Sequence, residues 1–154
     1  MSTLDDIDPD KILIGYPEIL PEHSFIVDGL AQGSFPSYTL VMDVPWSLII
    51  SLSRQHRNHN VPYIHFPFTD GPVLPDTYVL DDLATMVAKR VRAGMQVLVH
   101  CDAGLNRSGL VAGLALLKLG YKNDDALALL RKKRCAEVLH NPIFRKYLLS
   151  RGDL

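Results

Sequence analysis

Short apolar runs, separated by polar, proline or glycine residues, mark the first two thirds of the chain. Such runs, rich in valine, isoleucine and aromatic residues, are typical of β-strands. They lie at residues 12–14, 25–27, 48–52, 63–66 and 97–99. The last three are predicted to be buried strands.

Apolar residues then recur at helical spacing. From Val79 to Val91 they return every four positions, between Asp76, which can cap a helix start, and Gly94, which can end one. A second helix is predicted from about Arg107 to Leu119. It is apolar on nearly all sides, as expected of a central buried helix.

Two further helices are predicted near the C-terminus. One begins at an Asn123 cap and ends in basic residues, and the other has Asn141 as its cap and Pro142 at its first position. Strands alternate with helices early in the chain, and helices accumulate late. This order predicts an α/β fold in which helices flank a central mixed, mostly parallel sheet.

Length and composition fit one domain. We expect residues 1–10, which are polar, to form a flexible N-terminus and residues 11–154 to form a single catalytic domain. The net charge of -1 gives no reason to expect a nucleic acid partner. No apolar run reaches the length of a membrane span, and the acidic N-terminus does not resemble a secretory signal. We therefore expect a cytoplasmic monomer without membrane contact.

The two cysteines, Cys101 and Cys135, are too few for a disulfide framework and have no metal-ligand spacing. No metal and no organic cofactor is expected. Cys101 follows the strand at 97–99 and precedes the helix from Arg107, so it lies in a tight loop between them. Such a loop can direct several backbone N–H groups, with a helix N-terminus behind them, at a tetrahedral anion.

A cysteine at the bottom of this loop is expected to be a thiolate nucleophile. Cys101 would attack phosphorus and form a thiophosphate, while the planar fork of Arg107 binds two phosphate oxygens. Ser108 can donate a hydrogen bond to the departing thiolate. His100 is expected to orient the loop through backbone hydrogen bonds without touching substrate. The phosphate would be bound by the loop residues Asp102, Ala103, Gly104, Leu105, Asn106 and Arg107.

Residues 100–109 carry the string His-Cys-x-x-Gly-x-x-Arg-Ser-Gly, which resembles the signature of protein tyrosine and dual-specificity phosphatases. The resemblance extends over about residues 25–148. It implies a compact dual-specificity phosphatase that acts on phosphorylated proteins or peptides.

A second catalytic residue is expected in the proline-rich loop at residues 67–75. On spacing alone, Asp70 is equally a general acid or a turn residue. It lies 31 residues before the nucleophile (101 − 70), where the family resemblance places a mobile acid loop, and this favours the catalytic role. Asp76 is the rival, although helix capping explains it better. The Asp102 side chain is expected to point outward and to disfavour acidic substrates.

Two other functions compete with this interpretation. With Asn106 directly before the arginine, the loop is similar to the loop of the RNA 5′-triphosphatase branch of the same fold. Proteins of that branch generally lack the acid and usually have a basic face. A catalytically silent phosphate-binding adaptor is the other, but such proteins typically lose the cysteine or the arginine. Cys135 is interpreted as structural.

Overall fold

A five-stranded mixed sheet forms the centre of the protein. The computed structural model describes residues 20–57 and 60–151. The strands run in the spatial order β1-β2-β5-β3-β4. β1 pairs with β2 in antiparallel fashion, and all other pairs are parallel. Their bounds are β1 His23–Val27, β2 Leu30–Gly33, β3 Leu48–Ser51, β4 Tyr63–His65 and β5 Val97–His100.

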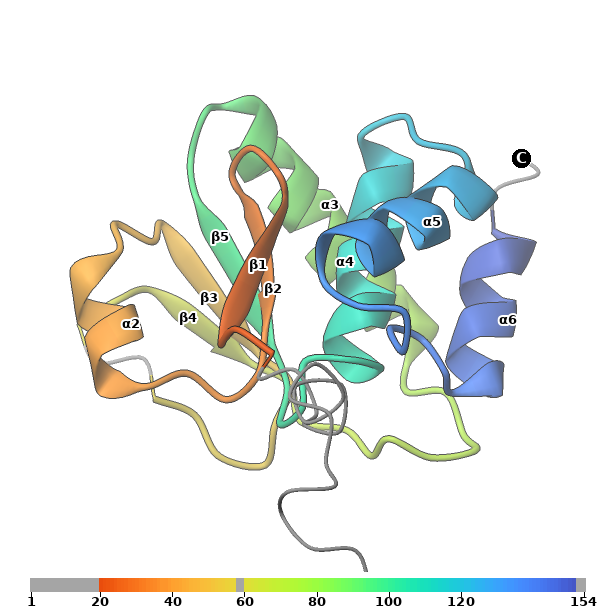
Figure 1. The fold of residues 1–154 in the computed structure, drawn as a ribbon, viewed down its shortest axis with the longest axis horizontal. Helices are drawn as coiled ribbons and strands as arrows, with labels where there is room; N and C mark the ends of the chain where they lie inside the picture. The colour runs from red at the N-terminus through yellow and green to blue at the C-terminus, as the bar shows by residue number, and fades with distance from the viewer. Residues whose placement is uncertain (1–19, 58–59, 152–154) are drawn as a thin grey trace, which may run out of the picture.

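Helices cover both faces of this sheet (Figure 1). The short helix α2 lies on one face, and four longer helices lie on the other. The helices are α2 Tyr38–Asp43, α3 Thr77–Arg92, α4 Arg107–Lys118, α5 Asn123–Lys133 and α6 Pro142–Ser150. No helix in these described parts is both long and apolar enough to cross a membrane.

The alternation of strand side chains divides the core into two layers. Ala31, Ile49 and Leu98 face α2 and pack with its buried residues. The neighbouring strand positions face the four longer helices and join the larger cluster around α4. Helix α4 is buried from Ser108 to Leu116, as its sequence predicts.

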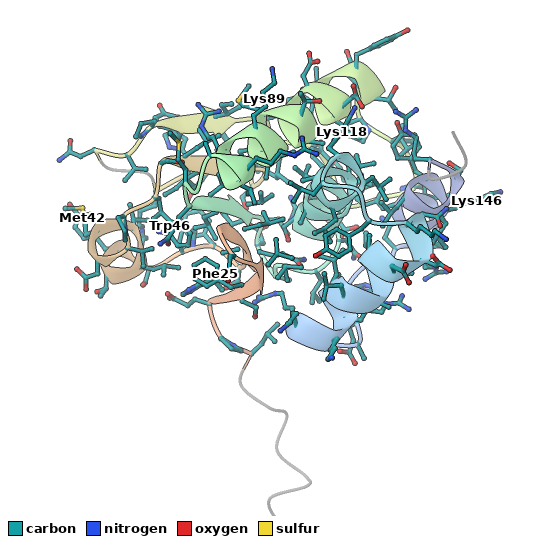
Figure 2. The ribbon with its side chains drawn as sticks, turned by 90° about the horizontal axis from the view of Figure 1, so that it is seen from above. Phe25, Met42, Trp46, Lys89, Lys118 and Lys146 are labelled. Carbon is teal, nitrogen blue, oxygen red and sulfur yellow. The ribbon has the colours of Figure 1, made fainter. Side chains whose placement is uncertain are left out.

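Figure 2 shows where the apolar and charged side chains lie in relation to these layers. Phe25 and Trp46 stack with ring centroids 5.9 Å apart, which closes the smaller layer beside β1. Lys89, Lys118 and Lys146, from three different helices of the larger layer, are exposed. These three lysines therefore lie on the sides of their helices that face away from the core.

The predicted α/β architecture is confirmed, with three corrections. β4 is an edge strand rather than a buried one, and Tyr63 at its start is 48% exposed. Asn123 is the first helical residue of α5, and Lys122 occupies the cap position. α2 was not predicted, because six residues are too few to show a helical period. The apolar run at 12–14 and the flexible segment predicted at 1–10 lie outside the described residues.

We predict that Asp76→Ala lowers the free energy of unfolding by about 1 kcal/mol. The Asp76 carboxylate accepts hydrogen bonds from the backbone N–H groups of Tyr78 and Val79 at the start of α3. Alanine leaves both donors without this acceptor. Urea denaturation measures the change, and Asp76→Ser, which keeps a capping oxygen, should recover most of it. Equal stability of the alanine variant and the wild type would contradict the capping role.

Candidate active site

The loop from Cys101 to Asn106 leaves the carboxyl end of β5, a central strand with β2 and β3 on either side. It leads directly into α4 (Figure 1). The carboxyl ends of parallel strands are where open α/β sheets place their binding sites. A depression of about 530 Å³ lies beside this loop. It is lined by Arg54, Pro67, Phe68, Thr69, Asp70, Asp102 and Arg107.

The backbone carbonyl groups of residues 102–105 accept hydrogen bonds from donors outside the loop. The Asp102 carbonyl accepts from the Phe35 N–H at 3.1 Å, and the Leu105 carbonyl from the Leu139 N–H at 3.1 Å. The Arg134 guanidinium donates to the Gly104 carbonyl at 2.7 Å and to the Ala103 carbonyl at 3.5 Å. The N–H groups of residues 102–107 donate to no group within residues 20–57 and 60–151. Peptide groups turned in this way form an anion-binding cradle.

Gly104 makes this turn possible. Its φ of +71° lies in the left-handed region. A Cβ atom there would lie 2.5 Å from the Gly33 carbonyl carbon and 2.6 Å from the Ser34 nitrogen. The loop can approach the end of β2 this closely only with glycine at position 104.

Cys101 is 2% exposed and lies against the first turn of α4. Its Sγ is 3.2 Å from the Ser108 Oγ, and the Ser108 backbone N–H donates to it at 3.4 Å. A thiol would donate its proton to the hydroxyl, whereas a thiolate would accept the proton of that hydroxyl. The structure thus brings Ser108 to the position where the sequence predicted it would contact the nucleophile.

One donor group of Arg107 has no partner among the described residues. Its Nη1 donates to the Phe68 carbonyl and its Nη2 to an Asp102 carboxylate oxygen, both at 3.2 Å. Its Nε is buried, and among the described residues it has no hydrogen-bond partner. Buried donors in proteins are nearly always paired. An oxyanion in the cradle would supply the missing acceptor.

Asp102 differs from its prediction. Its side chain is 66% exposed, as expected, but its carboxylate is turned onto Arg107 rather than out toward solvent. The nearby Ser53 hydroxyl and the Arg107 guanidinium lower the pKa of the Asp102 carboxyl. Asp102 is therefore ionised at neutral pH and competes with a bound anion for Arg107.

Asp70 lies close to the cradle and is held by two asparagines. Asn106 Nδ2 donates to one carboxylate oxygen of Asp70 at 2.9 Å, and Asn141 Nδ2 donates to the other at 2.8 Å. Asn141 also caps α6, because its Oδ1 accepts from the N–H groups of Ile143 and Phe144. The sequence predicted the cap but not the contact with Asp70.

His100 is fully buried and does not line the depression. Its Nε2 pairs with the Ser51 hydroxyl of β3 at 2.8 Å. Burial lowers the pKa of His100 to about 4, and the Cys101 backbone and the Asp102 carboxylate offset only part of this effect. His100 is a neutral support behind the loop.

Two residues that support the cradle were missed by the sequence reasoning. Arg134 lies in the basic run that the sequence placed at the end of a helix, yet it is only 7% exposed and also reaches the Pro21 carbonyl and the Ser24 hydroxyl, each at 3.1 Å. Burial lowers the pKa of Arg134, and the nearby Cys135 and Cys101 oppose this shift. Gln32 is fully buried in β2 and contacts the same loop. Neither residue has a local sequence signal, because their partners are distant in the chain.

The described residues hold no group of three His, Cys, Asp or Glu that could bind a metal ion.

The sequence matches the model of the dual specificity phosphatase catalytic domain family over residues 36–153. The chain belongs to this family. The resemblance noted from the signature at residues 100–109 is thereby confirmed.

Curated relatives of this phosphatase domain carry related names. Protein tyrosine phosphatase type IVA 3 of Homo sapiens is 40% identical over 75 residues, which cover 48% of this chain and 43% of the relative. Dual specificity protein phosphatase OPG106 of vaccinia virus is 32% identical over 103 residues, which cover 61% of this chain and 58% of the relative. These matches span about half the length of the relatives. None of the names favours an RNA 5′-triphosphatase or a silent adaptor.

Solved structures share the fold. Human DUSP28 superimposes with a TM-score of 0.74 at 21% identity, covering 88% of this chain and 95% of that chain. Tk-PTP in its active form gives a TM-score of 0.69 at 26% identity, covering 86% of this chain and 99% of that chain. The predicted phosphatase-like fold is confirmed.

We predict that Asp102→Asn tightens the binding of inorganic phosphate. The substitution removes the carboxylate that shares Arg107 with the anion, and a partly exposed pair of this kind corresponds to about a two- to fivefold change in Kd. Isothermal titration calorimetry at neutral pH measures it. Asp81→Asn is the matched control, because Asp81 pairs with Lys118 and Arg151 instead, and it should leave the Kd unchanged. Weaker binding by Asp102→Asn would show that Asp102 positions Arg107 rather than competing for it.

Proposed function

We propose that this chain hydrolyses phosphomonoesters on phosphorylated proteins or peptides through a cysteinyl-phosphate intermediate. One observation carries the proposal: Cys101 Sγ lies beneath a loop in which the carbonyl groups of residues 102–105 are bonded elsewhere, and the buried Nε of Arg107 has no partner among the described residues. This arrangement suits a dianionic phosphate that is attacked by sulfur.

In the first step the Cys101 thiolate forms a bond to phosphorus as the bond from phosphorus to the leaving oxygen breaks. The loop N–H groups and Arg107 bind the equatorial oxygens, where charge is concentrated in the transition state. The leaving oxygen takes a proton from Asp70, which lines the same depression as Arg107. General acid catalysis of this kind contributes about 10²- to 10⁴-fold.

In the second step a water oxygen attacks phosphorus and gives its proton to the Asp70 carboxylate. The bond between sulfur and phosphorus breaks, and its electron pair returns to Cys101 as a thiolate. The Ser108 hydroxyl, 3.2 Å from Sγ, donates a hydrogen bond to the sulfur as its charge develops. Inorganic phosphate leaves, and the thiolate is regenerated.

The contacts of Asn106 support a phosphomonoester rather than an RNA 5′-triphosphate as the substrate. The sequence left Asn106 as the one feature in favour of the RNA branch. Its side chain donates to Asp70 at 2.9 Å, so this asparagine serves to hold an acid that an RNA 5′-triphosphatase generally does not need. We further propose that the protein works in the cytoplasm, where glutathione and thioredoxin keep a cysteine thiol reduced.

We predict that Cys101→Ser binds phosphate or vanadate but shows no measurable turnover, because a serine hydroxyl is not ionised at neutral pH. The assay is hydrolysis of p-nitrophenyl phosphate, and binding is measured by calorimetry. Cys135→Ser is the matched control, since Cys135 is the other free cysteine, and it should keep nearly full activity. Retention of more than a few per cent of the wild-type rate by Cys101→Ser would contradict the mechanism.

We predict that the effect of Asp70→Asn depends on the leaving group. A general acid matters most for a basic leaving group, so hydrolysis of a tyrosyl or alkyl phosphate should slow by about 10²-fold or more. The rate with p-nitrophenyl phosphate should fall much less. Steady-state kinetics on the three substrates measure this pattern.

Asp76→Asn is the matched control for Asp70→Asn, because Asp76 is the rival candidate for the acid, its carboxylate caps α3, and asparagine is also a good helix cap. It should behave like the wild type on all three substrates. Equal slowing of every substrate by Asp70→Asn would instead assign the Asp70 loop to binding or structure. A preference for RNA 5′-triphosphate that is insensitive to Asp70→Asn would favour the RNA-processing alternative.

A further inference from the structure

Gln32 is a buried amide beside the nucleophile with no role in the mechanism described so far. It lies in β2, all of whose residues are buried, and its own exposure is 0%. Its Nε2 donates to the Ser108 Oγ at 3.2 Å and to the Gly104 carbonyl at 3.1 Å, and lies 3.5 Å from the Leu105 carbonyl. One amide therefore touches both the cradle and the residue that contacts Cys101.

The orientation of this amide is set by its neighbours. Two of the three atoms around Nε2 are carbonyl oxygens, which can only accept hydrogen bonds. The Gln32 Oε1, in contrast, is buried and has no hydrogen-bond partner in residues 20–57 and 60–151. An unpaired buried oxygen is unfavourable, and an apolar residue at position 32 would avoid it. Packing alone therefore does not explain why a glutamine occupies position 32. The hydrogen bonds that its Nε2 donates are the reason that remains.

The donor side of Gln32 determines where the Ser108 proton can point. A hydroxyl has one proton to donate and two lone pairs that accept. Because Gln32 Nε2 occupies one lone pair of Ser108 Oγ, the hydroxyl cannot turn its proton toward Gln32. Among the described residues, the other hydrogen-bond neighbour of this oxygen is Cys101 Sγ, at 3.2 Å. When the sulfur is a thiolate, the hydroxyl proton is therefore directed at it.

We propose that Gln32 is a positioning residue that acts through Ser108 to speed the breakdown of the cysteinyl phosphate. This inference rests on the proposed function. In the breakdown step water attacks phosphorus, its proton passes to Asp70, and the S–P electron pair returns to sulfur. A Ser108 proton already aimed at Sγ stabilises that charge without first having to reorient. Formation of the cysteinyl phosphate consumes the thiolate and gains nothing from this hydrogen bond.

The test is Gln32→Met, which keeps the volume of the side chain and removes its donor. With p-nitrophenyl phosphate, the pre-steady-state burst reports formation of the cysteinyl phosphate, and the following linear phase reports its breakdown. We expect the linear rate to fall by about tenfold, the effect of about one lost charge-assisted hydrogen bond. The burst rate should change by less than about twofold.

Two comparisons separate a positioning role from a structural one. Ser108→Ala should slow the linear phase at least as much as Gln32→Met, and adding Gln32→Met to Ser108→Ala should cause no further loss. Leu30→Met, a volume-conserving change in the same strand, should leave both phases unchanged. The proposal would be overturned if the losses of the two single variants multiply in the double variant. It would also be overturned if Gln32→Met slows the burst and the linear phase equally.

Gln32→Glu provides a second test with unchanged shape, which also serves if Gln32→Met does not fold. A neutral glutamic acid can donate to Ser108 Oγ, whereas its carboxylate can only accept and would draw the hydroxyl proton away from Sγ. The rate of the linear phase of Gln32→Glu should therefore fall in a step as the pH rises. The wild type should show no such step, and adding Ser108→Ala to Gln32→Glu should remove it. Absence of this step would also overturn the proposal. A wild-type enzyme that forms no trappable cysteinyl phosphate would instead overturn the proposed function itself.

Discussion

The orientation of four peptide groups is the constraint on which the rest of this structure depends. An anion can be held by backbone N–H groups only if the carbonyl groups of the same peptides point away from it. Here the carbonyls of residues 102–105 reach donors from four separate parts of the chain: the segment after β2, β2 itself, the end of α5, and the turn before α6. The fold around the loop can be understood as the means of bringing these donors together.

The donors also set the electrostatics around the sulfur. Arg134 places a positive charge behind the loop, and its bonds to the Pro21 carbonyl and to Ser24 tie the cradle to the segment leading into β1. A buried cation is costly unless its donors are satisfied, and the carbonyls of Ala103 and Gly104 help to satisfy them. The same hydrogen bonds that orient the loop thus allow a guanidinium to be buried near Cys101. Arg107, on the substrate side, has its charge shared by Asp102 until an anion arrives.

The sequence was sufficient to predict a structural feature wherever the residues that cause it lie close together along the chain. Asp76 and Asn141 cap the helices they precede, because a helix cap depends on residues only a few positions away. Burial of β4 was predicted wrongly, since an apolar run does not reveal whether a strand lies at the edge of its sheet. Gln32 and Arg134 were missed for a related reason. Their partners lie 30 to 113 residues away along the chain, and nothing near either residue distinguishes it from an ordinary strand or surface position.

The position of Asp70 shows how the cradle and the acid are connected. The sequence suggested a proline-rich loop that closes over bound substrate, but both Asp70 carboxylate oxygens already accept amide hydrogen bonds here. One amide belongs to Asn106, which is part of the cradle and whose Oδ1 accepts the backbone N–H of Asn141. The other belongs to Asn141, which also starts α6. The acid, the cradle and the final helix therefore share one hydrogen-bond network. An acid held in this way needs little reordering when substrate binds, and such preorganisation lowers the entropic cost of reaching the reactive geometry.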